Sequence, residues 1–489
     1  MIRSISCRNW TNPSPAHRVH EPVGGPDRNR TDDHADDPVD DNVYLDNAAT
    51  TWPKPEPVYR LMDRFSRDIG VNPGRGGHAL AADADRLVRQ TRRLLAALFG
   101  HAGSPDRVVF TTNGTEALNV ALTGLLAGAG ALSGARAHGQ AGARTGGTPG
   151  RVVTTGLEHN AVWRTLNHLA RDHGLRVEHV APDRDGYIDP ALVDAALEQP
   201  AAVLVVNHAS NVIGTVQPIE AIGAVARRRG VPLVVDAAQS AGVLPIDMAA
   251  CGIDVLTFPG HKGLFGPMGS GGLIVAEGHE LPPLRFGGTG VDSASPFQPD
   301  VWPFRLEAGT LAAPAIAGLF AAQLWLAALG RTLLERVPAP HEPLGVPDGL
   351  EAALERAEGI DAADHAQACR RAMRHLHAVE MSHLTALERV LVRHPSVRVL
   401  GGARTGERVA TLCFVVDGMA ADEIAERLDA DHGICCRAGL HCAPLAHDAL
   451  RTTALGGAVR LSPGYFTRAT DIERFAAGLD EILGGPSAG

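Results

Sequence analysis

The chain has 489 residues, which is enough to bury a large core and to form two domains. Its formal net charge is -10, so we expect no nucleic acid or anionic membrane as a partner, and we expect no apolar run of transmembrane length. The N-terminus lacks the apolar segment of a secretory signal, and seven cysteines are too few and odd in number for a disulfide framework. These features predict a cytoplasmic enzyme.

Three segments of biased composition divide the chain. Residues 1–41 are rich in Pro, Asp, Asn and Arg without apolar periodicity, which predicts a disordered tail. A Gly/Ala/Arg-rich stretch from Gly128 predicts a flexible loop, and residues 331–376 predict a helical insert between domains. We therefore predict a large domain over residues 42–330, whose first residues join the small domain, and a small C-terminal α+β domain over residues 377–489.

Short apolar runs alternate with helical patterns through the large domain. Apolar runs predict strands at 107–112, 151–156, 177–180, 201–210, 231–240, 253–258 and 271–277. Helical patterns at 115–128, 161–174 and 220–230 separate several of them. This β-α-β alternation predicts an α/β fold with a mostly parallel sheet flanked by helices, and such sheets carry their sites at the carboxyl ends of the strands.

Polar residues gather at the carboxyl ends of these predicted strands or just after them. They are His159; His208, Ser210 and Asn211; Asp236 and Gln239; and His261 and Lys262. Gly114 and Thr115 stand at a strand-to-helix turn. Taken singly, each has an ordinary structural explanation, such as a helix cap, a turn or a solvated side chain. Together they predict a single polar cleft.

Pyridoxal 5'-phosphate (PLP) is a cofactor that needs this combination of residue types. Lys262 offers the amine for a Schiff base, and Asp236 offers a carboxylate for the pyridine nitrogen. Gly114 and Thr115 offer a helix start for the phosphate. A flat side chain, His159, is suited to stack on the ring.

Nine motifs, taken in order, resemble one known family. They are "YLDNAAT", "NPGRGGH", "NGTEALN", "EHNAV", "NHASNVIGTVQPI", "VDAAQSAG", "GHKGLFGPMGSGG", "EAGT" and "RAGLHCAPL". The chain resembles the class V aminotransferase family over residues 43–330 and 377–485, and most of all its group II cysteine desulfurase and selenocysteine lyase branch. The resemblance implies a PLP-dependent fold type I enzyme that forms a homodimer with shared active sites.

The resemblance assigns a role to individual residues. It implies that Lys262 and Cys442 are catalytic, and that Asn211, Arg460 and Arg437 bind the substrate. The cofactor-binding residues that it implies are Gly114, Thr115, His159, Asn211, Asp236, Gln239, His261 and, across the dimer, Thr310. No metal is implied. The chain departs from many relatives at Pro259, where a phosphate-binding hydroxyl is common, and at Leu440, where a histidine is common.

The stretch "GICCRAGLHCAPLAH" contains three cysteines with different expected roles. Cys442 matches the nucleophile of the family, and we expect Arg437 and His441 to favour its thiolate. Cys435 and Cys436 continue a short strand, so they point to opposite faces, and we interpret them as packing residues.

The resulting hypothesis is conversion of L-cysteine to L-alanine, with the sulfur captured as a persulfide on Cys442 and passed to an acceptor protein, for iron–sulfur assembly or another thiolation pathway. Selenocysteine lyase activity, and another class V reaction such as transamination or epimerisation, remain alternatives. A sulfur-assembly scaffold without activity is a further alternative, but it has no need of Lys262.

Overall fold

The computed structural model describes residues 42–74, 77–132, 150–401 and 408–485. The predicted tail, Cys7 and most of the predicted loop after Gly128 lie outside the described residues. These described residues belong to one compact unit that begins at Asn42.

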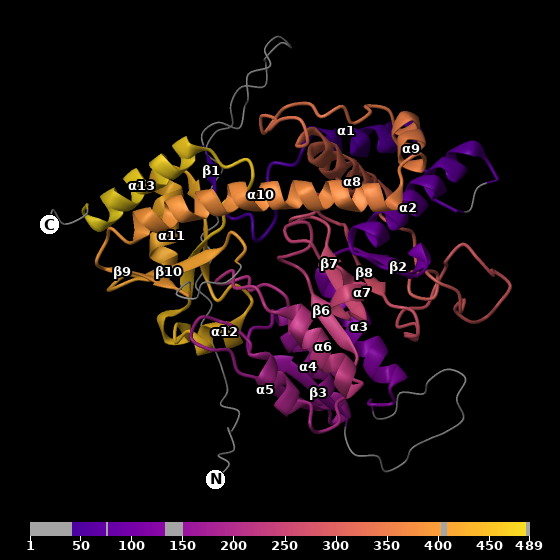
Figure 1. Cartoon of the computed structure of the whole chain (residues 1–489), viewed down its shortest axis with the longest axis horizontal. Helices are drawn as coiled ribbons and strands as arrows, with labels where there is room; N and C mark the ends of the chain where they lie inside the picture. Colours follow the sequence, from indigo (N-terminus) through magenta and orange to yellow (C-terminus); the bar gives the residue numbers. More distant parts are fainter. Residues whose placement is uncertain (1–41, 75–76, 133–149, 402–407, 486–489) are drawn as a thin grey trace, which may run out of the picture. The chain divides into compact units, whose positions relative to one another are not determined.

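A seven-stranded sheet forms the centre of the larger part of the fold (Figure 1). Its strands, in sheet order, are β2 (Val108–Thr111), β8 (Gly271–Val275), β7 (Val255–Pro259), β6 (Leu233–Asp236), β5 (Val203–Asn207), β3 (Arg151–Thr155) and β4 (Arg176–Val180). All neighbours are parallel except at β8, which runs antiparallel to both β2 and β7. The predicted mostly parallel sheet is confirmed.

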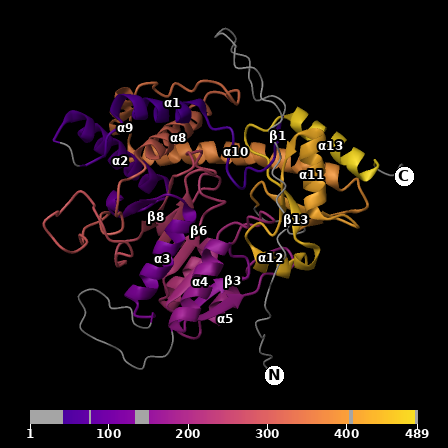
Figure 2. The ribbon, with the colours of Figure 1, turned by 180° about the vertical axis from the view of Figure 1, so that it is seen from behind.

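The central strands are mostly apolar because both faces of the sheet are covered. Val205 and Val234 point into one hydrophobic cluster, whereas their neighbours Val206 and Val235 point into another. Helices α3 (Gly114–Gly128) and α4 (Asn160–His173) lie side by side over the first face (Figure 2). Successive side chains of a strand alternate between faces, so a strand buried on both sides has few polar residues, and those of β5 and β6 are Asn207 and Asp236 at the carboxyl ends.

The other helices complete the fold. They are α1 (Glu56–Arg64), α2 (Ala79–Leu98), α5 (Pro190–Ala196), α6 (Ile219–Arg229), α7 (Met248–Cys251), α8 (Ala313–Thr332), α9 (Leu350–Glu358), α10 (Ala362–Leu391), α11 (Ala421–His432), α12 (Pro444–Ala449) and α13 (Ala469–Leu483). Shorter helical turns are η1 (Phe65–Ile69), η2 (Pro105–Arg107) and η3 (Thr453–Leu455).

Helix α8 corrects one expectation from the sequence. Its 20 residues are long and apolar enough to cross a membrane by length and composition, so the expectation that no run reaches this length was wrong. Nearly all of the helix is buried, and it packs against α1, α2 and α10. Its apolar sequence is therefore explained by its place in the protein core.

Helix α10 links the two sheets of the molecule (Figure 1). It packs on α2 and α8 at one end and on α13 and β9 (Val397–Leu400) at the other. The helix runs without a break across residues 376 and 377, where we placed a domain boundary. The chain therefore has no structural break at that boundary, because one helix belongs to both neighbouring cores.

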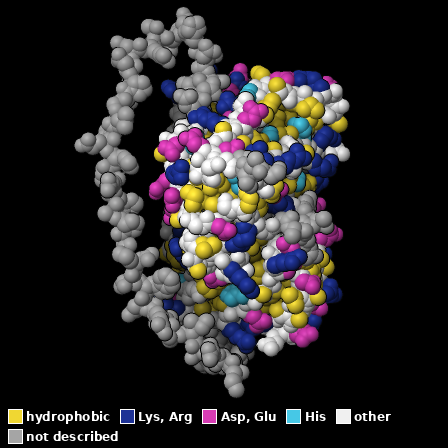
Figure 3. All heavy atoms as spheres, turned by 90° about the vertical axis from the view of Figure 1, so that its left-hand side faces the viewer, with side chains coloured by type: hydrophobic (Ala, Val, Ile, Leu, Met, Phe, Trp, Pro, Cys, Tyr) yellow, Lys and Arg dark blue, Asp and Glu magenta, His cyan; other side chains and the backbone are white. Residues whose placement is uncertain are grey.

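A second, smaller sheet lies in the C-terminal part. Its order is β12 (Arg437–Gly439), β13 (Ala458–Leu461), β10 (Leu412–Val416) and β9, all antiparallel. Separately, β1 (Val43–Tyr44) pairs in parallel with β11 (Ile434–Cys435), so the first described residues join the C-terminal elements. On the face in Figure 3, basic and acidic side chains are interspersed rather than gathered by sign.

Candidate active site

Asp236 is the last residue of β6, and Lys262 lies just beyond the carboxyl end of the neighbouring strand β7. The pKa of Lys262 is lowered to about 8, mainly by desolvation and next by Arg460, while Asp236 acts in the opposite direction. Burial raises the pKa of Asp236, whose Oδ1 accepts a hydrogen bond from the Ala238 N–H at 2.9 Å. The pair thus combines an amine that deprotonates more easily than usual with a buried carboxylate near it.

His159 follows strand β3 and caps helix α4. Its Nδ1 accepts a hydrogen bond from the Ala161 N–H at 3.1 Å, which leaves the proton of the neutral ring on Nε2. Burial, and next the nearby Lys262, lower the pKa of His159 to about 4. The sequence predicted a flat side chain at this edge of the sheet, and the structure places a neutral imidazole there.

Glu158 is a buried carboxyl group that the sequence analysis missed. Its Oε1 accepts hydrogen bonds from Thr155 Oγ1 at 2.6 Å and from the Asn207 N–H at 3.1 Å. Burial, with Asp236 contributing, raises its pKa to about 8, so the group is protonated at neutral pH. Its position immediately before His159, in the motif "EHNAV", was the available signal.

The segment from Thr50 to Lys54 clamps His261, the residue before Lys262. The carbonyl of His261 accepts hydrogen bonds from Lys54 Nζ at 2.6 Å, from Thr50 Oγ1 at 3.1 Å and from the Thr51 N–H at 3.2 Å. The ring of His261 also lies 3.1 Å from Thr50 Oγ1. Burial lowers the pKa of Lys54 to about 7, and the sequence analysis missed this second lysine of the site.

Arg460 and Arg437 share one counter-ion, Asp46. Arg460 Nη2 donates to Asp46 Oδ1 at 2.6 Å, and Arg437 donates to Asp46 Oδ2 from Nε at 3.1 Å and from Nη2 at 3.0 Å. Arg460 is buried, whereas Arg437 is half-exposed. The sequence analysis missed Asp46, although it lies within the motif "YLDNAAT".

Asn211 joins the large sheet to the C-terminal elements. Its carbonyl accepts a hydrogen bond from Arg460 Nη1 at 3.1 Å, and its Nδ2 donates to the His441 carbonyl at 2.6 Å. Asn211 Oδ1 and Arg460 Nε are buried and have no hydrogen-bond partner among the residues that the structure describes. Such groups are normally satisfied, so both atoms are candidates to bind a polar ligand.

The remaining predicted cofactor residues differ in position and in exposure. Gly114 begins α3 beside β7, where an added Cβ would lie 3.4 Å from Pro259. Thr115 is exposed on the first turn of α3, and Gln239 Nε2 donates to the Ala48 carbonyl at 3.0 Å. Thr310 lies exposed in the loop before α8, and no contact joins it to the other predicted residues within the described part of the chain.

Cys442 is exposed on the loop between β12 and α12. The Asn160 N–H, at the start of α4, donates to the Cys442 carbonyl at 2.6 Å. This bond and the one from Asn211 tie the loop to the edge of the sheet where Lys262 lies. The expectation that His441 favours a thiolate was wrong, because burial, and next Arg460, lower the pKa of His441 to about 2 and leave the ring neutral.

The other two cysteines of this stretch differ from Cys442. Cys435 is paired in register with Tyr44, and Cys436 packs against the hydrophobic cluster of the C-terminal elements. Burial raises the pKa of Cys436 to about 12. A neutral, packed thiol is a poor nucleophile.

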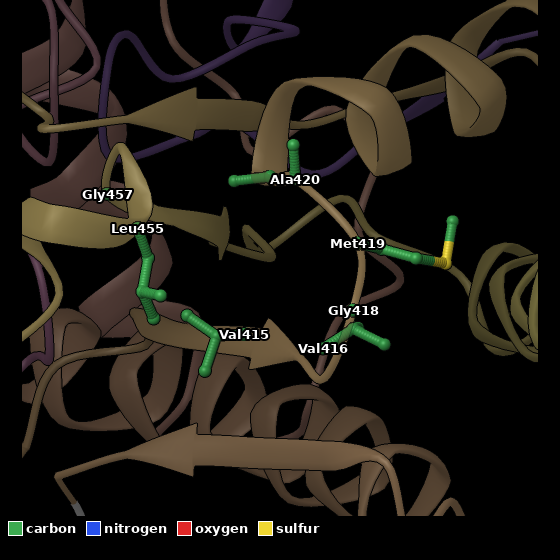
Figure 4. Close-up of a pocket in the computed structure, with 8 residues that line it drawn as sticks. Val415, Val416, Gly418, Met419, Ala420, Leu455 and Gly457 are labelled. Carbon is green, nitrogen blue, oxygen red and sulfur yellow. The ribbon is translucent and has the colours of Figure 1, made fainter.

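An apolar pocket of about 270 Å³ lies away from these residues (Figure 4). Val415 and Leu455 face each other across it. It contains none of the predicted site residues, so its size does not identify it as the active site.

The donor set at the strand ends fits PLP. The readily deprotonated Lys262 suits a Schiff base, and the buried Asp236 carboxylate near it is suited to hold a pyridinium. The start of α3 at Gly114 offers free N–H groups to a phosphate, although Pro259 beside it cannot donate.

The sequence profile of the family described as Aminotransferase class-V matches residues 43–339 and 357–475. The chain therefore belongs to the class V aminotransferase family, whose members use PLP. It is 30% identical over 448 residues to a probable cysteine desulfurase of Methanothermobacter thermautotrophicus, covering 91% of this chain and 95% of that protein. It is 36% identical over 234 residues to the cysteine desulfurase IscS of Pectobacterium carotovorum, covering 48% of this chain and 53% of that protein.

Solved structures agree with this assignment. The apo structure of a cysteine desulfurase from Thermococcus onnurineus has a TM-score of 0.72 and 26% identity, covering 91% of this chain and 95% of that one. The cysteine desulfurase CsdA of Escherichia coli, in an S-sulfonic acid form, has a TM-score of 0.67 and 25% identity, with coverage of 91% and 95%. The predicted fold type I architecture is confirmed.

Proposed function

We propose that this chain is a PLP-dependent cysteine desulfurase that converts L-cysteine to L-alanine and captures the sulfur on Cys442. The observation that carries the proposal is the pairing of Lys262 and Asp236 at the strand ends with an exposed cysteine on a loop tied to the same edge by Asn160 and Asn211. The names of the relatives support the same reaction.

Binding of the substrate carboxylate is assigned to Arg460. Its guanidinium is fixed by Asp46 and Asn211 and retains a buried Nε donor. A planar guanidinium held on two sides presents its remaining N–H donors in fixed directions, which orients the carboxylate without further ordering. Asn211 Oδ1 is available to accept a hydrogen bond from the substrate.

Lys262 and Asp236 have complementary roles with protons. PLP supplies an electron-withdrawing ring that stabilises negative charge at the α-carbon of the substrate. With PLP bound, Asp236 would keep a proton on the pyridine nitrogen, and the flat, neutral His159 would be suited to stack on the ring. Lys262, with a pKa near 8, is suited to move the α-proton at neutral pH.

Cys442 performs the sulfur transfer. Its thiolate attacks the Sγ of L-cysteine, a new S–S bond forms, and the Cβ–S bond breaks. The electron pair of the broken bond stays with the carbon fragment, which takes up a proton and leaves as L-alanine. Cys442 then carries a persulfide. Its exposure suits delivery to an acceptor protein, and we propose iron–sulfur assembly as one destination.

The decisive experiment measures L-alanine and the mass of Cys442 after the purified enzyme is mixed with L-cysteine. We expect alanine formation and an added sulfur on Cys442, and we expect both to be lost in Cys442→Ala. Full turnover in that variant would contradict the persulfide step. Turnover of L-selenocysteine alone, or formation of a keto acid or racemised product, would support the alternative reactions.

We also propose a cytoplasmic homodimer in which Thr310 reaches the phosphate of the partner's cofactor. Thr310 is exposed, which supports a role at a second subunit. Light scattering gives the mass of the assembly, and Thr310→Val should weaken cofactor retention. A monomer with full activity would contradict this proposal.

A further inference from the structure

The loop that carries Cys442 contains two consecutive residues in the left-handed region. His441 has φ 49° and Cys442 has φ 54°, and neither is glycine. A side chain with a Cβ adopts this backbone only when surrounding contacts hold it there. The bonds to the His441 and Cys442 carbonyls from Asn211 and Asn160 fix the backbone from the side of the large sheet.

A chain of hydrogen bonds holds the same turn from the other side. His441 Nδ1 lies 3.1 Å from His447 Nε2, and the two rings are stacked at a centroid distance of 5.3 Å. His447 Nδ1 lies 2.8 Å from Thr452 Oγ1. Burial lowers the pKa of His447 to about 4, so both rings are neutral, and a hydrogen bond between the facing nitrogens requires a proton on one of them.

His447 is fully buried on α12, and both of its ring nitrogens have a partner. An apolar residue would fill this space without the cost of desolvating two nitrogens, so its hydrogen bonds account better for a histidine than packing does. In the part of the chain that the structure describes, the other side-chain group within reach of His441 Nδ1 is the Cys413 thiol, at 3.9 Å. A thiol is a weaker partner than an imidazole.

We infer that His447 is a positioning residue for Cys442: by bonding to His441, it fixes the left-handed turn that aims the Cys442 thiol. The effect of His447 on catalysis rests on the proposed function. Its effect on the order of the turn does not, because that order is measured without turnover. Thr452 is the next link and holds the ring of His447 in the orientation that faces His441.

A pair of substitutions distinguishes the hydrogen bond between His447 and His441 from the packing of the His447 ring. His447→Asn keeps an amide near Nδ1, which faces Thr452, but removes the group that faces His441. His447→Gln places an amide near Nε2 and restores the link to His441. Asp448→Asn, at an exposed neighbour on the same helix, is the matched control.

Two measurements are made on the holoenzyme. Hydrogen–deuterium exchange of the amides at 440–443, including the Ala443 N–H that donates to the Leu440 carbonyl at 2.9 Å, reports the order of the turn. Steady-state kinetics with L-cysteine separates kcat from KM. We expect His447→Asn to lower kcat about tenfold with little change in KM, as a small displacement of a reacting group does, and to speed exchange in this segment. His447→Gln and Asp448→Asn should resemble the wild type.

Unchanged exchange and unchanged kcat in His447→Asn would overturn the inference. Equal decreases in kcat in the His447→Asn and His447→Gln variants would also overturn it, because packing of the ring alone would then explain them. If His447→Asn does not fold, Thr452→Val gives the same comparison one link further out, and wild-type exchange and kcat in that variant would count against the inference. If the wild type forms no alanine, the proposed function fails, while the exchange data still decide whether His447 orders the turn.

Discussion

The two halves of the site differ in how they are held. Lys262, Asp236 and His159 lie at the ends of buried parallel strands, whose hydrogen bonds and double-sided packing leave little freedom. Cys442 is exposed on a loop with left-handed backbone, tied by a few individual hydrogen bonds. A cofactor pocket gains from rigidity, whereas a thiol that must meet a substrate sulfur and then an acceptor needs to be accessible.

The largest effect is expected on the rigid side. Lys262→Ala removes the amine that moves the α-proton, and we expect a loss of alanine formation of about 10³-fold or more. Lys54→Met is the matched control, because Lys54 is a second lysine with a lowered pKa beside His261. It should lose less than about tenfold if its role is to hold the His261 carbonyl. Equal losses of alanine formation in both variants would contradict the different roles proposed for the two lysines.

The next effect tests the loop side alone. Cys442→Ser should retain the visible absorbance of the bound cofactor but lose alanine formation by about 10²-fold or more, because a hydroxyl is a poor nucleophile toward sulfur. Cys436→Ala, a packed thiol with a pKa near 12, should keep near wild-type turnover. Loss of cofactor absorbance in Cys442→Ser would mean that the two halves are not independent.

A smaller effect is expected where the halves meet. Arg460→Lys replaces a fork that contacts Asp46 and Asn211 with a single ammonium. Loss of one charge-assisted hydrogen bond, about 2 kcal/mol, should raise KM for L-cysteine roughly 30-fold. Arg437→Lys is the matched control, since Arg437 is half-exposed and should matter less. A larger KM change in the control would reverse the assignment.

The smallest effect concerns the pH dependence of stability. Glu158 has a raised pKa of about 8, so between its ordinary value of 4.5 and about 8 the unfolded chain releases this proton and the folded chain keeps it. The contribution of Glu158 to the free energy of unfolding is therefore fully present below about pH 4.5 and is lost as the pH rises through 8. Glu158→Gln should reduce the fall in Tm between pH 5 and pH 8.

Glu380, on α10, also has a raised pKa of about 8, and Glu380→Gln should reduce the same fall without lowering turnover. An unchanged Tm profile in Glu158→Gln would show that Glu158 is ionised in the folded protein. A decrease in kcat confined to Glu158→Gln would place Glu158 among the groups that support His159 and Asp236.

The strands of the large sheet were predicted because they depend on local patterns, although the strands predicted at 201–210 and 231–240 end earlier, at Asn207 and Asp236. Apolar runs of strand length are visible in sequence, and the residues after them are brought to one edge by the rules of parallel sheets. Asp46, Glu158, Lys54 and His447 were missed because their importance comes from long-range contacts or burial. Asp46 and Arg460, for example, are 414 positions apart.

The sequence by itself determined the α/β fold, the family and the positions of Lys262, Asp236 and Cys442, because these follow from periodicity and from ordered motifs. Only the tertiary structure decided which charges are paired and which rings are neutral. His441 illustrates the difference: beside Cys442 in sequence it was expected to promote a thiolate, but burial against His447 and proximity to Arg460 keep it uncharged. Desolvation and ion pairing depend on what surrounds a group in space, and that environment is fixed only when the chain has folded.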